Sequence, residues 1–142
     1  MSGDGHPARA ASQQSMAAVE AGDRRTWLAL FAPDAVVQDP IGVSPLDPTG
    51  LGHRGVDAIA AFYDTVIAPN RVSFAIRESY ASGDEVANVG TITTTFPDGG
   101  RALVDGVYTY RVDDDGRLVA LRAYWEVHAL RYEPPPGAAP ER

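Results

Sequence analysis

Four strand-like runs in the second half of the chain constrain its fold more than any other feature. They cover residues 71–80, 85–96, 101–112 and 117–130, and β-branched and aromatic side chains recur in each. The separators between them, SGD, PDGG and DDDG, each supply a glycine for the positive φ that tight turns need. This pattern predicts a meander of long antiparallel strands.

The first half of the chain predicts three helices. An alanine-rich stretch over 8–21 favours a helix that ends at Gly22, followed by Asp23 as the cap of a second helix. We expect that second helix to stop at Pro33, with one apolar side made of Trp27, Leu28, Leu30 and Phe31.

A short strand over 34–39 and a loop rich in proline and glycine separate these helices from the third. The third helix begins near residues 56–57, and helical spacing places four residues on one face: Ile59, Phe62, Tyr63 and Val66. Helices followed by an antiparallel meander indicate the α+β class, with helices packed on one face of a bent sheet.

The composition narrows the function classes. A length of 142 residues predicts one domain, expected over 8–133, with proline- and glycine-containing ends at 1–7 and 134–142 as flexible tails. The net charge of −7 argues against a nucleic-acid partner and against docking on an anionic membrane. Absence of cysteine excludes disulfides and thiol catalysis. Without a signal peptide or a spanning segment, we expect a cytoplasmic protein.

Alternation along the last two runs assigns side chains to the two faces of the sheet. Val104, Tyr108 and Tyr110 share one parity in the third run, whereas Asp105 has the other. In the fourth run, the inward set is Val119, Leu121, Ala123, Trp125 and Val127, and the outward set includes Arg122, Tyr124 and Glu126. Inward tyrosines either fill the core or line a cavity with polar groups, because a buried hydroxyl needs a partner.

The stretch VQDPIG places Asp39 at a strand end, directly before Pro40. One interpretation is a turn, since Asp-Pro commonly terminates strands and Pro40 disfavours helical geometry at Asp39. The other is a carboxylate that faces a pocket. No other acidic residue is expected to point inward.

Three stretches resemble the ketosteroid isomerase branch of the NTF2-like (SnoaL-like) superfamily: residues 17–42, 55–63 and 115–127. The most specific of their motifs is Val-x-Asp-Pro-Ile-Gly, which contains Asp39. The resemblance implies a conical α+β barrel, in which a strongly curved antiparallel sheet wraps over three helices around a ligand pocket. It also implies a homodimer formed through the outer sheet face.

The resemblance further implies that Asp39 is a general base. The family's two oxyanion donors, a tyrosine and an aspartic acid, correspond to Ser15 and Tyr108 here. Loss of one such donor typically lowers the rate by about 10²–10³-fold, so Tyr108, or more weakly Ser15, would have to substitute. Tyr63 matches a tyrosine that supports the family's hydrogen-bond network.

We expect one cavity lined by Phe31, Tyr63, Val104, Tyr108 and Trp125, with Ser15 on its wall. His53 and Arg54 lie in the long loop, where the histidine is either solvated or a second acid–base group. The three histidines are scattered, so we expect no metal site, and no cofactor is implied.

Three functions remain open. The first is an isomerase that shifts a proton in a steroid or a similar apolar carbonyl ligand. The second is another pocket enzyme, such as an epoxide hydrolase, cyclase or dehydratase of polyketide-type substrates. The third is a small-molecule binding protein in which Asp39 only forms a turn.

Overall fold

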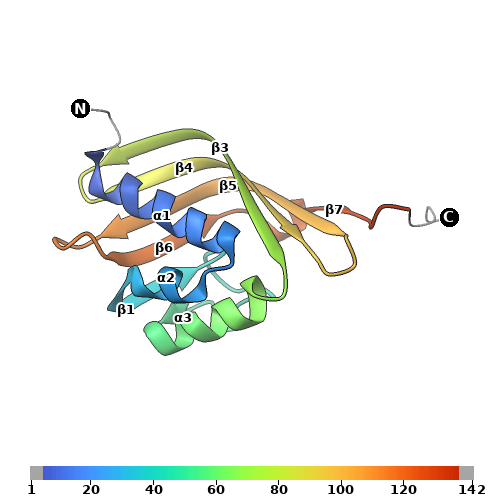
Figure 1. Ribbon diagram of the computed structural model, residues 1–142, viewed down its shortest axis with the longest axis horizontal. Helices are drawn as coiled ribbons and strands as arrows, with labels where there is room; N and C mark the ends of the chain where they lie inside the picture. Colours follow the sequence, from blue (N-terminus) through green and yellow to red (C-terminus); the bar gives the residue numbers. More distant parts are fainter. Residues whose placement is uncertain (1–4, 138–142) are drawn as a thin grey trace.

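Three N-terminal helices lie on one face of a single sheet in the computed structural model, which describes residues 5–137 (Figure 1). Of the expected tails 1–7 and 134–142, residues 1–4 and 138–142 lie outside the described residues, and Pro7 already belongs to the first helix. The helices are α1 (Pro7–Ala21), α2 (Arg24–Ala29) and α3 (Val56–Phe62), and a π-helical turn over Tyr63–Ile67 continues α3. No helix within 5–137 is long and apolar enough to cross a membrane.

The predicted caps between the first two helices are present. Gly22 ends α1 with a φ of 68°, the left-handed conformation that glycine adopts without strain. The Asp23 side chain then accepts a hydrogen bond from the backbone N–H of Thr26 and caps α2. These two residues turn the chain sharply, so α2 packs beside α1 rather than extending it.

The sheet contains the predicted meander. Strands β3 (Arg71–Ser82), β4 (Glu85–Thr95), β5 (Arg101–Val112) and β6 (Leu118–Tyr124) pair antiparallel in sequence order. The α+β class with N-terminal helices on this sheet is therefore confirmed.

The sheet as a whole is mixed and open, which corrects the expectation of a strongly curved antiparallel barrel. Strand β1 (Phe31–Gln38) pairs parallel with β6, and the two-residue β2 (His53–Arg54) forms an edge beyond it. The order is β2-β1-β6-β5-β4-β3, so β2 and β3 are free edges, and the sheet is not strongly curled.

The sequence pattern predicted that the second helix stops at Pro33, and this is wrong. Helix α2 ends at Ala29, and Pro33 lies inside β1. Its lack of an N–H is tolerated because the pairing of β1 with β6 is irregular between Phe31 and Val36. Phe31 consequently belongs to the strand and not to the second helix.

The last predicted strand is shorter than expected. After Tyr124 the chain leaves β6, makes a 3-10 turn over Val127–Ala129 and returns as β7 (Arg131–Glu133). Strand β7 pairs with the beginning of β5, at Arg101–Leu103, whereas β6 pairs with its second half from Val107 onward.

A row of close backbone contacts crosses the middle of the sheet at two paired glycines. Gly90 on β4 lies opposite Gly106 on β5. A Cβ on Gly90 would lie 2.2 Å from the carbonyl oxygen of Ala75, and one on Gly106 would lie 2.4 Å from that of Tyr124. Glycine is therefore required at both positions so that neighbouring backbone can approach.

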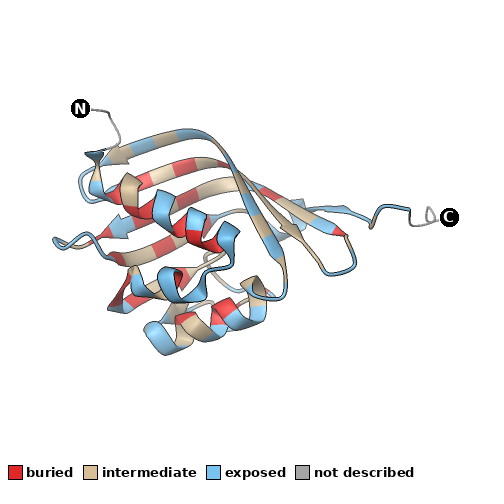
Figure 2. Cartoon of the chain, viewed as in Figure 1, coloured by how far each residue is buried: buried red, intermediate tan, exposed pale blue. Residues whose placement is uncertain are grey.

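The core lies between the helices and the inner face of the sheet, where the buried residues of both layers face each other (Figure 2). Trp27 is at its centre and packs edge-on against Phe31, with ring centroids 4.8 Å apart. The alternation predicted for β5 is confirmed, since Tyr108 and Tyr110 are buried. In β6 it holds at Ala123 but is wrong at Val119, because the β5–β6 pairing shifts register near the start of β6 and Leu118 is the buried residue there.

We predict that Gly90→Ala destabilises the protein by about 1–3 kcal/mol, because the added methyl group forces backbone apart in a packed sheet. Urea unfolding monitored by tryptophan fluorescence would measure the change. Glu85→Ala, at an exposed position on the same strand, is the control and should stay within about 0.5 kcal/mol of the wild type. Equal midpoints for the Gly90 variant and the wild type would contradict the prediction.

Candidate functional site

Two adjoining chambers lie between the helices and the sheet. The inner chamber has a volume of about 80 Å³ and the outer one about 360 Å³. Four residues line both chambers and so mark their junction: Asp39, Val66, Ile92 and Thr94. Apolar groups dominate both walls, and Asp39 supplies the only carboxylate among the described residues that line them.

Asp39 follows β1 directly and is held in place from β6. The backbone N–H of Ile41 donates to the carbonyl of Ala123 at 3.0 Å, and the Asp39–Pro40 peptide bond is cis. The indole Nε1 of Trp125 donates to Asp39 Oδ1 at 2.7 Å. The Ile41–Ala123 and Trp125–Asp39 hydrogen bonds both lie at the end of the parallel β1–β6 pair. Together they give the carboxylate one defined position in the cavity.

Burial raises the pKa of Asp39, because the apolar surroundings disfavour the charged form. The hydrogen bond from Trp125 and the nearby His53 act in the opposite direction and favour the carboxylate. A raised pKa makes the carboxylate a stronger base than an exposed aspartate, which suits a group that accepts and returns a proton.

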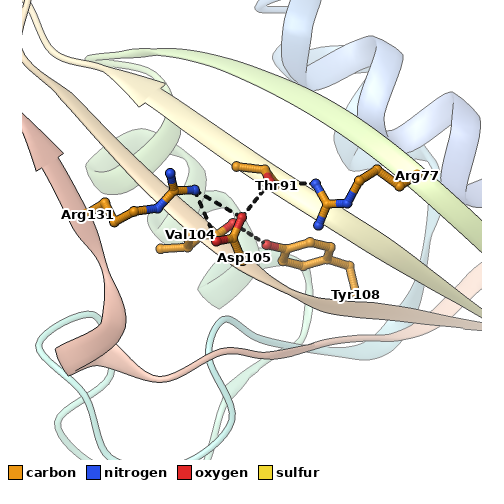
Figure 3. A network of polar contacts seen from close by, with 6 residues as sticks. All are labelled: Arg77, Thr91, Val104, Asp105, Tyr108 and Arg131. Carbon is orange, nitrogen blue, oxygen red and sulfur yellow. Dashed lines mark hydrogen bonds and ion pairs between the residues drawn. The ribbon is translucent and has the colours of Figure 1, made fainter.

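The inward face of β5 contributes Tyr108 and Tyr110 to the inner chamber and Val104 to the outer one. Figure 3 shows the Tyr108 hydroxyl turned back along its own strand, where it donates to the carbonyl oxygen of Val104 at 2.8 Å. The proton of this hydroxyl is thus already committed to the backbone. Tyr108 was the foremost substitute donor in the sequence analysis, and its geometry does not favour that role.

Asp105 has the outward orientation that alternation predicts. It is exposed, forms an ion pair with Arg131 at 3.0 Å and accepts a hydrogen bond from Thr91 on the neighbouring strand (Figure 3). This network belongs to the outer face of the sheet, so Asp105 is remote from the chemistry of the cavity.

Ser15 lies on the wall of the inner chamber and is buried. Its Oγ accepts a hydrogen bond from Trp27 Nε1 at 3.0 Å. Tyr110 lines the same chamber, and its inward parity in the sequence does not by itself indicate a site residue. Burial and the charge of Asp39 raise the pKa of Tyr110, while hydrogen bonding with Ser15 lowers it.

Phe31 and Tyr63 lie in the core rather than on the walls of either chamber, which corrects their expected place in the cavity. Both rings pack against Trp27, which does line the inner chamber, and the Tyr63 and Trp27 centroids are 5.4 Å apart. Trp125, Val104 and Ser15 do line the chambers, divided between the outer and the inner one.

The long loop contains a second buried acid, contrary to expectation. Asp47 is 5% exposed and accepts hydrogen bonds from Thr49 Oγ1 and the Gly52 N–H, which lower its pKa. It does not line the chambers and instead holds the loop together. Asn and Asp side chains often bond their own loop backbone in this way, but the sequence alone does not reveal which of several loop acids will do so.

His53 and Arg54 are also outside both chambers. His53 stacks on Phe62, with centroids 4.8 Å apart, and its Nε2 has no hydrogen-bond partner among the described residues. Arg54 is exposed and reaches the carbonyl of Asp34. Within 5–137, no three acidic or histidine side chains gather as potential metal ligands.

Comparisons with known proteins agree with this architecture. Residues 12–121 match the SnoaL-like domain family. A steroid Delta-isomerase of Nocardioides simplex is 30% identical over 117 residues, which cover 82% of this chain and 88% of that protein.

Solved structures extend the similarity. The Delta 5-3-ketosteroid isomerase of a Mycobacterium species is 48% identical with a TM-score of 0.87, covering 90% of this chain and 99% of that one. Rv0760c of Mycobacterium tuberculosis, in complex with estradiol-17β-hemisuccinate, is 41% identical with a TM-score of 0.85, covering 89% and 98%. The chain therefore belongs to the SnoaL-like (NTF2-like) family and is a homologue of ketosteroid isomerases within it.

Proposed function

We propose that this protein is a ketosteroid isomerase-like enzyme that shifts a proton in a steroid or a similar apolar carbonyl ligand, with Asp39 as the general base. The main support for this proposal is the position of Asp39. It is a carboxylate at the junction of two apolar chambers, fixed by a 2.7 Å hydrogen bond from Trp125. The apolar walls of the chambers suit an apolar ligand, and Asp39 is the carboxylate that would contact this ligand.

The reaction requires only groups that are present. Asp39 would remove a proton from the carbon next to the carbonyl, and the electrons of that C–H bond would form a C=C bond as the carbonyl oxygen becomes negative. The protonated Asp39 would then return the proton to the γ-carbon of the conjugated system, and the carbonyl would re-form. The positions of Val104 and Trp125 in the outer chamber suit contact with the rest of the skeleton.

A binding protein is the second candidate, and one observation favours it. Ser15 and Tyr108 stand at the positions of the family's two oxyanion donors, and the Tyr108 hydroxyl donates to Val104. A pocket without donors would retain affinity for an apolar ligand but would lose about 10²–10³-fold in rate for each missing donor.

We predict that Asp39→Asn lowers the turnover of a 5-ene-3-ketosteroid by at least about 10²-fold, because the amide cannot accept the proton. Ligand binding should persist, since an amide is easier to desolvate than a carboxylate. Formation of the conjugated enone, followed by ultraviolet absorption, measures the first effect, and steroid titration the second. A wild type that binds steroids yet shows no activity that depends on Asp39 would favour the binding protein.

The same substitution should stabilise the protein at neutral pH. The folded-state pKa of Asp39 is raised, so the folded state binds more protons than the unfolded one between the two pKa values, and stability falls as pH rises through them. Thermal midpoints should therefore be higher for Asp39→Asn than for the wild type at pH 7 and should converge near pH 3. Asp34→Asn, at an exposed position of β1, should show no such gain. A lower midpoint for Asp39→Asn at pH 7 would contradict this prediction.

We also propose a homodimer formed through the outer face of the sheet. Tyr124 on β6 is 50% exposed there, beside the polar side chains of Arg122 and Glu126, a mixture suited to an interface with a polar rim. Light scattering at micromolar concentration should report twice the chain mass for the wild type and a shift toward the monomer for Tyr124→Asp. Leu51→Asp, at an exposed loop position, should remain dimeric. A monomeric wild type would exclude this assembly.

A further inference from the structure

The polar end of the inner chamber contains a chain of side chains that the proposed base does not use. Trp27 Nε1 donates to Ser15 Oγ, and both residues are buried. An indole N–H can only donate, so the serine oxygen is the acceptor and the serine proton remains for another partner. Tyr110 lines the chamber with Ser15 and hydrogen-bonds with it. Donation from Trp27 to Ser15 and from Ser15 to Tyr110 is therefore the order that these groups allow.

This order leaves the hydroxyl proton of Tyr110 for the cavity. In the described part of the chain, the Tyr110 hydroxyl donates to no carbonyl or carboxylate, whereas that of Tyr108 donates to Val104. The two tyrosines share the inward face of β5, yet only Tyr110 retains a donor. Burial and the charge of Asp39 hold its pKa far above the ordinary value, so it stays protonated at neutral pH.

We propose that Tyr110 is a catalytic residue that donates a hydrogen bond to the carbonyl oxygen of the ligand, and that Ser15 is the positioning residue that orients it. This inference rests on the proposed function and specifies its ligand. The inner chamber, of about 80 Å³, has room for little more than the end of a ligand, so we expect a terminal cyclic ketone to enter oxygen first. The reacting carbons would then lie at the junction, beside Asp39.

The protons in this reaction balance. One proton moves from carbon to Asp39 and back to carbon, and Tyr110 keeps its own proton while its hydrogen bond to the developing oxyanion shortens. A donor that strengthens its bond only as charge develops favours the transition state over the bound ketone. No oxidant, reductant or cofactor enters the balance.

Tyr110→Phe and Tyr108→Phe form a matched pair, because each removes one hydroxyl from the same face of β5. We expect Tyr110→Phe to lower kcat by about 10²–10³-fold, the usual effect of losing one oxyanion donor. Tyr108→Phe should lower kcat by less than about tenfold, since its hydroxyl is bonded to Val104. The opposite ranking would overturn the inference.

A binding experiment separates this inference from the proposed function. Estradiol carries a phenolic hydroxyl on its terminal ring, and 3-deoxyestradiol lacks it, so the ratio of their affinities measures recognition of that oxygen. The titrations use Asp39→Asn as the parent, because its neutral side chain imitates the protonated base. Adding Tyr110→Phe should reduce the preference for estradiol by about tenfold, the value of roughly one hydrogen bond, whereas adding Tyr108→Phe should leave it within about threefold.

The outcomes are distinct. If the wild type isomerises no steroid but Tyr110→Phe removes the estradiol preference, the proposed function and the catalytic role of Tyr110 both fail, and only its hydrogen bond to the ligand oxygen is supported. If Tyr110→Phe leaves the preference intact, or Tyr108→Phe abolishes it, the inference is overturned whatever the turnover. Should Tyr110→Phe not fold, Ser15→Ala takes its place: a reduced preference supports the positioning role, and an unchanged one refutes it.

Discussion

The hydrogen bond between Trp125 and Asp39 is the interaction on which the architecture of the cavity depends. A carboxylate among apolar side chains is unfavourable unless a donor satisfies it, and the indole of Trp125 supplies that donor at 2.7 Å. The pair forms only because β1 lies parallel to β6, which brings the residue after one strand beside the residue after the other. The parallel pairing is thus a requirement of the site as well as a feature of the sheet.

The paired glycines in the middle of the sheet make this arrangement possible. Gly106 lets the backbone of Tyr124 approach β5 closely, at the point where β6 ends and the chain turns away toward β7. Trp125 follows immediately and projects into the cavity instead of continuing the ladder. A side chain at position 106 would keep the backbone of Tyr124 away from β5. The glycine therefore sets the direction in which the Trp125 side chain projects.

Local patterns predicted the parts of this structure that local chemistry determines. The helix caps at Gly22 and Asp23, the antiparallel meander and the inward face of β5 all follow from turn residues and alternation. The parallel insertion of β1 and the return of β7 do not, because they depend on pairing between distant segments. Alternation did place Tyr110 inward, but no pattern in one sequence indicates that Ser15 lies opposite it.

A small residue on α1 and a large one on β5 both line the inner chamber, and their sizes bear on which element can supply a donor hydroxyl. Where the family resemblance expects a tyrosine on α1, this chain has Ser15, and the space that a small residue leaves on a helix is available to a large one on the facing strand. Tyr110 is that large residue, since it lies on β5 and lines the same chamber. The hydroxyl then comes from the sheet, and Trp27 and Ser15 on the helical side orient it. In the proposed site, a hydroxyl on a strand would therefore take the part that the family resemblance assigns to a hydroxyl on a helix.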